Sequence, residues 1–328
     1  MKRVLLNAEQ IADTKSLSKD EWLNIRKQGI GGSDASAICG LSKWSSPLSV
    51  YLDKVGERPS EIMDNEAMRQ GRDLEQYVAE RFLEYMEQQG TPKKVQRCNY
   101  VLRNIDNPFM MANVDRMVVG EQCGLECKTT SILNRSDWNA GEIPNEYYTQ
   151  CLHYMAVTGA SKWYLAVLVL NSGFYVYEIE RDEKVQDDIE ALVKLENQFW
   201  YLNVQKREPP KPNGSECDSN LLAEMYPNSD SDLVADLDIF QNEIDTYKAL
   251  GSQMKELETK QTAIKQELQQ VMGNAELGTA GTTKVSWKMQ ERKTLDKDLV
   301  KKVVGDKINE MYKVSSCRVF KILETKGG

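Results

Sequence analysis

The sequence of 328 residues predicts an α+β fold that continues into a mainly helical C-terminal extension. Apolar residues recur at helical spacing through most of the first 90 residues. Residues 97–180 contain short alternating or wholly apolar runs separated by turn residues, which is the pattern of β-strands. A long polar stretch at 231–272 then carries apolar residues at roughly heptad spacing, which is typical of an extended helix.

Four helices are predicted before residue 91. Ser18-Lys-Asp-Glu21 is a capping-box signature, so the first helix should begin near residue 19. In GIGGSDASAICG (29–40) the glycines permit a tight turn, and Ser33 is predicted to be the N-cap of a short helix that ends at Gly40. Another short helix is predicted over 47–55 and a longer one over 65–89, because each apolar pattern ends at a glycine.

The middle of the chain predicts strands and hairpins. Short runs from about 97 to 119 lead through the turn at 120–124 into LECKT (125–129), which indicates two strands joined by a turn. A helix over 145–157 follows, and WYLAVLVL-NSG-FYVYEIE (163–180) then predicts a hairpin with its turn at 171–173. A charged amphipathic helix over 182–204 completes this part.

The proline-rich segment REPPKPNGSE (207–216) predicts a linker. We therefore expect a first domain at 1–206, a linker at 207–217 and a helical region at 218–328. That region should contain a long helix, a short hairpin at 278–289, and a further helix and strand in the tail. Heptad-like spacing of its apolar residues suggests self-association or contact with a partner; these residues are Leu250, Met254, Leu257, Ile264 and Leu268.

Composition limits the classes of function. Hydrophobic residues make up 41% and charged residues 28% of the chain, and no apolar run reaches the roughly 18–20 residues of a membrane span. The net charge of −8, from 42 basic and 50 acidic residues, argues against a surface coated for nonspecific nucleic-acid binding, although a local basic groove stays open. Seven scattered cysteines favour a reduced cytoplasmic protein, and a single histidine favours an oxygen-bound metal such as Mg²⁺ or Mn²⁺.

Glu126 and Lys128 form a Glu-x-Lys pair on one face of the predicted strand, because side chains alternate along a strand. The spacing alone is weak evidence, since it recurs at 258–260, 291–293 and 324–326. Asp115 distinguishes the first copy, because a hairpin through the 120–124 turn would place it on the strand adjacent to Glu126. Two carboxylates and a lysine suit metal-assisted phosphodiester hydrolysis. A hairpin with exposed charges is the open alternative.

Several motifs in register resemble a known family. WLNIRKQGIGGSDASAICG (22–40), GRDLE (71–75), NVD (113–115), LECK (125–128) and YYTQCLHYM (147–155) follow the order found in YqaJ-type viral recombinases. Those proteins are relatives of lambda exonuclease with a PD-(D/E)XK nuclease core. The resemblance spans about residues 18–200. It implies a restriction-endonuclease-like mixed central sheet flanked by helices.

The resemblance also implies a role for each matching residue. Asp115 and Glu126 would bind a metal together with the backbone carbonyl of Cys127, and Glu75 would reach the same site directly or through water. Lys128 would position the attacking water. The other implied site residues are Gln150 and, with less support, Tyr154 within the active site, and Arg26 and Ser33 as ligands of a DNA phosphate.

Each implied role has an alternative in which the residue is structural. Glu75 could lie on a helix surface, and Gln150 and Tyr154 could be an ordinary helix face. Arg26 could pair only with a neighbouring acid, and Ser33 could only cap a helix. Related nucleases with iron–sulfur clusters need closely spaced cysteines near the C-terminus, so we expect no cluster, and we expect no nucleotide.

The function implied is that of a Mg²⁺-dependent deoxyribonuclease, with Mn²⁺ able to substitute. It would resect double-stranded DNA ends 5′ to 3′ for a single-strand annealing protein of the RecT/Redbeta type. Such relatives form rings, so a homo-oligomer is expected, in the cytoplasm of a bacterial host and encoded by a phage or prophage. The alternatives are an endonuclease or structure-specific nuclease of the same superfamily, and a non-catalytic protein that binds DNA ends.

Overall fold

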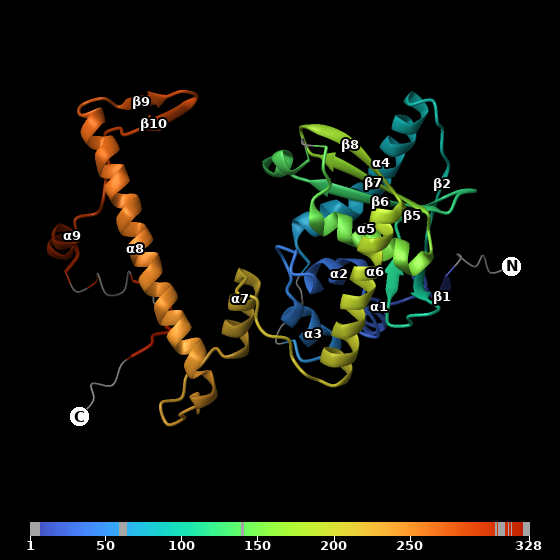
Figure 1. The fold of residues 1–328 in the computed structure, drawn as a ribbon, viewed down its shortest axis with the longest axis horizontal. Coiled ribbons are helices and arrows are strands. Elements are labelled where there is room, and N and C mark those ends of the chain that lie inside the picture. Colours follow the sequence, from blue (N-terminus) through green and yellow to red (C-terminus); the bar gives the residue numbers. More distant parts are fainter. Residues whose placement is uncertain are drawn as a thin grey trace. The chain divides into compact units, whose positions relative to one another are not determined.

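The computed structural model describes residues 7–58, 64–138, 141–305, 307, 312–313, 315 and 317–323 (Figure 1). Its contacts divide the chain into two compact units, Met1–Tyr226 and Pro227–Gly328. The first unit contains both sheets of the core and the predicted nuclease motifs. None of the described helices combines the length and the apolar composition that crossing a lipid bilayer requires.

The four predicted N-terminal helices are present. They are α1 (Lys19–Arg26), α2 (Gly32–Ile38), α3 (Pro47–Val55) and α4 (Glu66–Gln88). The capping box of Ser18 and Glu21 starts α1, as predicted, and Gly56 ends α3 with a φ of 77°. The prediction of Ser33 as an N-cap was wrong. Gly31 is the N-cap of α2, because the Asp34 carboxylate accepts the backbone N–H of Gly31 at 2.9 Å.

Five strands form the central mixed sheet in the order β2-β5-β6-β7-β8. Their bounds are Val95–Arg97, Arg116–Val118, Cys123–Thr130, Lys162–Val169 and Gly173–Glu180. β6 and β7 are parallel, and the other neighbouring pairs are antiparallel. The predicted hairpins are therefore present, with Asn171 at a φ of 59° in the β7–β8 turn. The predicted α+β class with a mixed central sheet flanked by helices is confirmed.

Helices cover the two faces of this sheet. Val78 and Phe82 of α4 pack with Leu125 and Tyr164 on one face. On the other face, α5 (Asn145–Thr158) connects β6 to β7, as a parallel pair requires, and its apolar side chains join those of α6 (Glu183–Gln198) in the larger core cluster. The helical path of α6 continues as a π-helical segment, Phe199–Gln205. Since Leu125 faces α4, the next residue, Glu126, faces α5.

A second sheet of three strands has the order β1-β3-β4, with bounds Ala8–Asp13, Tyr100–Asn104 and Met111–Asn113. β1 was not predicted, since the pattern of the first 90 residues indicates mainly helices. β1 pairs with β3 across some of the longest separations in the unit, Ala8 facing Asn104. No local pattern contains that information.

The helix α7 (Glu216–Met225) lies beyond the predicted linker but inside the first unit. Its Asp218 is buried and accepts hydrogen bonds from the Ser46 hydroxyl and from the backbone N–H of Asn213. Leu221 joins the main apolar core. The contacts thus divide the chain after α7, and the predicted boundaries at 206 and 217 stay a prediction about domains.

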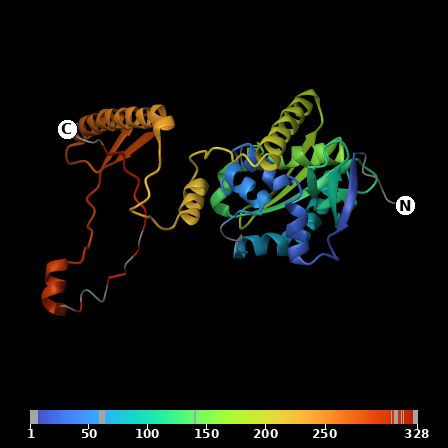
Figure 2. The same cartoon turned by 90° about the horizontal axis from the view of Figure 1, so that it is seen from below.

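The second unit is built around α8 (Gln241–Met272), a single uninterrupted helix (Figure 2). The predicted hairpin is present as β9 (Leu277–Ala280) and β10 (Thr283–Ser286), and α9 (Lys297–Val304) is the predicted tail helix. The described part of the tail contains no strand. The Glu-x-Lys copy at 324–326 lies outside the described residues.

Candidate active site

The hairpin of β5 and β6 brings the predicted carboxylates together. Arg116 faces Leu125 in its register, so Asp115, one position earlier, and Glu126, one position later, lie side by side. Asp115 is held by the opposite strand, because its Oδ2 accepts the backbone N–H of Cys127 at 2.9 Å. The predicted proximity of Asp115 and Glu126 is thereby confirmed.

Glu126 is almost completely buried, with 4% of its surface exposed. Its Oε1 accepts a hydrogen bond from Nε2 of Gln150 at 2.8 Å and lies 2.7 Å from Nζ of Lys128. Its Oε2 is buried and has no hydrogen-bond partner. A buried carboxylate oxygen without a partner is costly, and a bound cation is one of the few groups that would offset the cost.

Lys128 lies on the same face of β6 as Glu126, as the alternation of the strand predicted. Its ammonium is 5.5 Å from the centre of the Tyr147 ring. Burial alone would lower the pKa of Lys128, but the attraction and hydrogen bond of Glu126 outweigh it, so the pKa is raised. Lys128 is therefore a cation that can donate hydrogen bonds into the site.

The pKa of Asp115 is raised well above its ordinary value by burial and then by repulsion from Glu126 and Glu75. Lys128 and the Cys127 amide oppose that shift without cancelling it. Crowded carboxylates of this kind are what a divalent cation stabilises, and hard cations prefer oxygen ligands. Asp115 and Glu126 thus fit a Mg²⁺-like ion, although no group of three His, Cys, Asp and Glu side chains is placed to hold a metal among the described residues.

Glu75, on α4, is held by two arginines. Its Oε1 accepts hydrogen bonds from Arg97 at 2.8 Å and from Arg116. Arg116 is only 3% exposed and also donates to the backbone oxygen of Asp115 at 2.8 Å, so it joins Glu75 to the hairpin. Neither arginine was predicted; the available signal for Arg116 was a charged residue in the apolar strand next to Asp115. Whether Glu75 reaches a metal stays a prediction.

Gln150 and Tyr154 lie on one face of α5, as their spacing predicted, and both are buried. Nε2 of Gln150 donates to Glu126 and also contacts the Tyr154 hydroxyl at 2.7 Å. The ring of Tyr154 packs against Gly32, where a built Cβ would approach it to 2.6 Å. α5 therefore links the carboxylate site to the start of α2.

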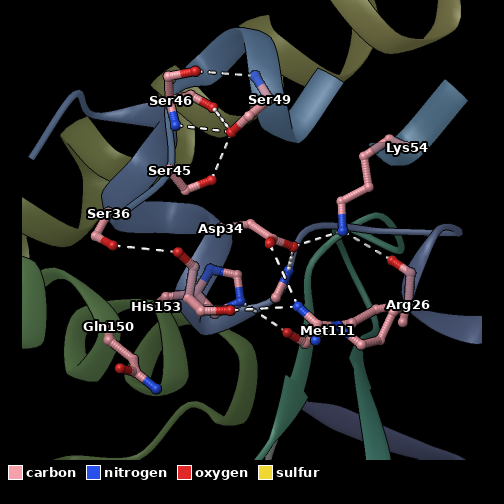
Figure 3. A network of polar contacts seen from close by, with 12 residues as sticks. Arg26, Asp34, Ser36, Ser45, Ser46, Ser49, Lys54, Met111, Gln150 and His153 are labelled. Atoms are coloured by element: carbon pink, nitrogen blue, oxygen red, sulfur yellow. Dashed lines mark hydrogen bonds and ion pairs between the residues drawn. The ribbon is translucent and has the colours of Figure 1, made fainter. Parts of the chain in front are cut away.

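Arg26 lies beside the buried ion pair of Lys54 and Asp34 (Figure 3), and the Ser33 hydroxyl is close to Arg26. Nη2 of Arg26 is 3.4 Å from the Ser33 hydroxyl and 3.6 Å from Oδ1 of Asp34. Lys54, whose side chain is fully buried, contacts Oδ2 of Asp34 at 2.6 Å and donates to the backbone oxygen of Arg26 at 2.9 Å. Burial opposes the charge on Asp34, but Lys54 and Arg26 together lower its pKa. Two cations share one carboxylate, which leaves the cluster net positive.

The structure thus brings five of the implied residues into one site and places two others on a neighbouring cluster. Direct contacts connect Glu126, Lys128, Gln150 and Tyr154. Asp115 joins them through the backbone amide of Cys127. Cys127 lies between Glu126 and Lys128 on β6. The role of its carbonyl as a metal ligand stays a prediction.

Residues 21–161 match the YqaJ-like viral recombinase domain. The chain is 36% identical over 320 residues to the uncharacterized protein YqaJ of Bacillus subtilis strain 168, an alignment that covers 97% of this chain and 98% of that protein.

Two solved structures are also similar. One is the alkaline exonuclease LHK-Exo of Laribacter hongkongensis, at 20% identity and a TM-score of 0.43, covering 58% of this chain and 98% of that one. The other is a phage related exonuclease of Haemophilus somnus 129PT, at 13% identity and a TM-score of 0.38, covering 57% of this chain and all of that one, 100%. Because the Bacillus relative matches along nearly its whole length, the chain belongs to the YqaJ-like viral recombinase family.

Proposed function

We propose that the chain is a metal-dependent deoxyribonuclease that resects duplex DNA ends 5′ to 3′. One observation carries the proposal. Glu126 has an unpartnered, buried Oε2 beside the crowded Asp115, and the cation of Lys128 lies on the same face of β6. An exposed ion pair on a strand would leave neither a buried carboxylate oxygen without a partner nor a second carboxylate next to it.

Each residue of the candidate site would have its own role in the reaction. Asp115 and Glu126 would hold Mg²⁺, or Mn²⁺ in its place, with the Cys127 carbonyl as a third oxygen ligand. A bound ion would supply the positive charge that stabilises the extra negative charge on the phosphate in the transition state. Lys128 would orient the attacking water by donating a hydrogen bond. Gln150, supported by Tyr154, fixes the orientation of the Glu126 carboxylate through the 2.8 Å bond to Oε1.

The preference for DNA ends rests on the cluster of Arg26, Ser33, Asp34 and Lys54. Since Lys54 satisfies one oxygen of Asp34 at 2.6 Å, the Arg26 guanidinium is left with a weak contact of 3.6 Å and a partly exposed side chain. Cζ of Arg26 lies 4.8 Å from the centre of the Trp22 ring. This stacking would hold the paired N–H donors of the guanidinium in place for a terminal 5′-phosphate. We place the 5′-phosphate there and the scissile bond at Lys128.

Family membership extends the proposal to recombination. The 3′ single strand left by resection would pass to a single-strand annealing protein of the RecT/Redbeta type. The protein would act as a homo-oligomer in the cytoplasm of a bacterial host, from a phage or prophage gene. These partners and this location rest on the resemblance of the motifs and on the family match.

Digestion of matched DNA substrates tests the proposed activity. We expect Mg²⁺-dependent degradation of linear duplex, little action on closed circles, and faster digestion of ends that carry a 5′-phosphate than of ends with a 5′-hydroxyl. Each substrate should be labelled at one 5′ end or one 3′ end, so that the polarity is read from the first product released. Cleavage of closed circles at the same rate would favour an endonuclease. End binding with no hydrolysis in either metal would favour a non-catalytic protein.

Replacing Arg26 by glutamine should remove the preference for 5′-phosphate. The variant loses the guanidinium fork, so the rate on phosphorylated ends should fall by roughly 10–100-fold, as expected for a lost charge-assisted contact. The rate on 5′-hydroxyl ends should change little. Arg207→Gln is the matched control, because the Arg207 side chain is 63% exposed and pairs with Glu57 at the surface. An unchanged ratio between the two end chemistries in Arg26→Gln would remove the 5′-phosphate assignment.

A further inference from the structure

The surface of α8 carries a regular apolar stripe. Its residues alternate at intervals of three and four from 247 to 271, which is the spacing of two core positions in a heptad repeat. The first position of each heptad is Tyr247, Met254, Gln261 or Leu268, and the fourth is Leu250, Leu257, Ile264 or Val271. A strict 3.5-residue period over this length predicts a left-handed supercoil with another helix, because an isolated straight helix has a period of 3.6.

The described residues of the second unit leave most of this stripe exposed. No residue of α8 is buried, and Met254, Leu257 and Val271 are 62%, 64% and 88% exposed. Tyr247, at the N-terminal end, touches the ring of Phe320 at 5.7 Å between ring centres and is still 58% exposed. A contiguous apolar surface along a helix about 48 Å long is typical of an interface.

We infer that α8 pairs in parallel and in register with α8 of a second copy of this chain. A self-matching stripe is what a two-fold dimer requires, since each heptad position then meets its own copy. In register, Gln261 meets Gln261 of the second copy, so the one polar side chain in the stripe gains an amide partner. An antiparallel arrangement, or a different apolar helix as partner, would bury the Gln261 amide against an apolar side chain.

The charges beside the stripe test this choice of orientation. The parallel pair places Lys260 near Lys265 of the second copy, which is unfavourable. An antiparallel pair could instead set Lys260 opposite Glu267, but only in a register that leaves Tyr247 and Leu250 uncovered. Exposed charge pairs contribute little, whereas each apolar core layer contributes substantially, so burial decides for the parallel register.

Cysteine cross-linking of the full chain tests register and orientation together. We expect Gln261→Cys to form an intermolecular disulfide under mild oxidation, because the two 261 side chains share a core layer. The matched control is Gln266→Cys, the same change five residues along on the outer face, and it should not cross-link. The seven native cysteines require that the linked peptide be identified by mass, with the wild type as the baseline. Equal cross-linking at 261 and 266, or none at 261, would overturn the proposal.

Sedimentation equilibrium of the full chain tests whether the stripe holds the copies together. Leu257→Glu combined with Ile264→Glu should weaken self-association at least 10-fold, since it places carboxylates in two core layers. Thr259→Glu combined with Gln266→Glu adds the same charge on the outer face and should leave association unchanged. The first unit serves as a folding check, because its described core clusters consist of residues up to Met225, and its unfolding transition should not shift in either variant. Identical association of both double variants would also overturn the proposal, whether or not the chain is a nuclease.

Discussion

Lys128→Ala is expected to reduce DNA cleavage by roughly 10³-fold, because it removes the cation beside Glu126 that can donate to the attacking water or to the developing charge. The loss should appear in kcat on linear duplex rather than in DNA binding. The variant should still fold, because Gln150 keeps its hydrogen bond to Oε1 of Glu126, but its Tm should fall, since a buried carboxylate loses its cation. A thermal melt of each variant beside the digestion assay separates the two effects.

Glu126→Gln should abolish cleavage to the same extent with less change in shape. The introduced amide keeps an oxygen that can accept the hydrogen bond from Gln150, but it removes the negative charge that would bind the metal. The control for both changes is Lys293→Ala, because Glu291 and Lys293 repeat the Glu-x-Lys spacing on an exposed segment without secondary structure. Cleavage at the wild-type rate in Lys128→Ala and Glu126→Gln would contradict the active-site assignment. Loss of cleavage in Lys293→Ala would show that the assay does not distinguish the proposed site from an exposed copy of the motif.

The candidate site was predictable because its central part is local. Strand alternation places Glu126 and Lys128 on one face, and the glycine-bounded turn at 120–124 fixes Asp115 on the neighbouring strand. The same is true of Gln150 and Tyr154, whose helical spacing gives them a common face. Each of these relations spans few residues, so the periods of strands and helices suffice to predict it.

What the sequence did not reveal depends on contacts between distant residues. Arg116 holds Glu75 across 41 positions, and Asp218 accepts the Ser46 hydroxyl across 172. Ser33 shows the same limit at short range. It has the composition of an N-cap, but the Asp34 carboxylate takes the Gly31 amide, because Lys54 and Arg26 hold Asp34 in place. Propensity identifies candidates for such roles, and tertiary contacts choose among them.

A buried ion pair joins α5 to α6, and it bears on stability. His153 and Glu196 are both fully buried, with Nδ1 of His153 at 2.8 Å from Oε1 of Glu196. Nε2 of His153 is 2.9 Å from the backbone oxygen of Met111, so both ring nitrogens face oxygen acceptors. Burial alone would lower the pKa of His153, but Glu196 and the two hydrogen bonds outweigh it and raise the pKa. These contacts and the raised pKa favour a protonated His153 side chain between Glu196 of α6 and Met111 of β4.

Glu196→Ala is therefore expected to lower the free energy of unfolding of the first unit by about 3–5 kcal/mol, since it leaves a buried cation without its partner. For a unit of this size the loss corresponds to a fall in Tm of about 10 °C. Glu196→Gln should cost much less, because the amide can donate to Nδ1 of a neutral His153. Glu57→Gln is the control, because it breaks an exposed pair with Arg207 and should barely change the Tm.

The pH dependence of the Tm distinguishes loss of the ion pair from a simple cavity. Because the folded protein raises the pKa of His153, the pair stabilises it fully below the ordinary value of about 6.5 and loses that contribution as the pH rises through the raised pKa. The Tm difference between the wild type and Glu196→Gln should therefore be largest near pH 6 and shrink as the pH rises through the raised pKa of His153. A cavity would cost the same at every pH. A difference that is constant across this range, or that grows with pH, would contradict a charged His153, whereas the predicted decrease would assign the stabilisation to the buried pair that anchors α5 behind the site.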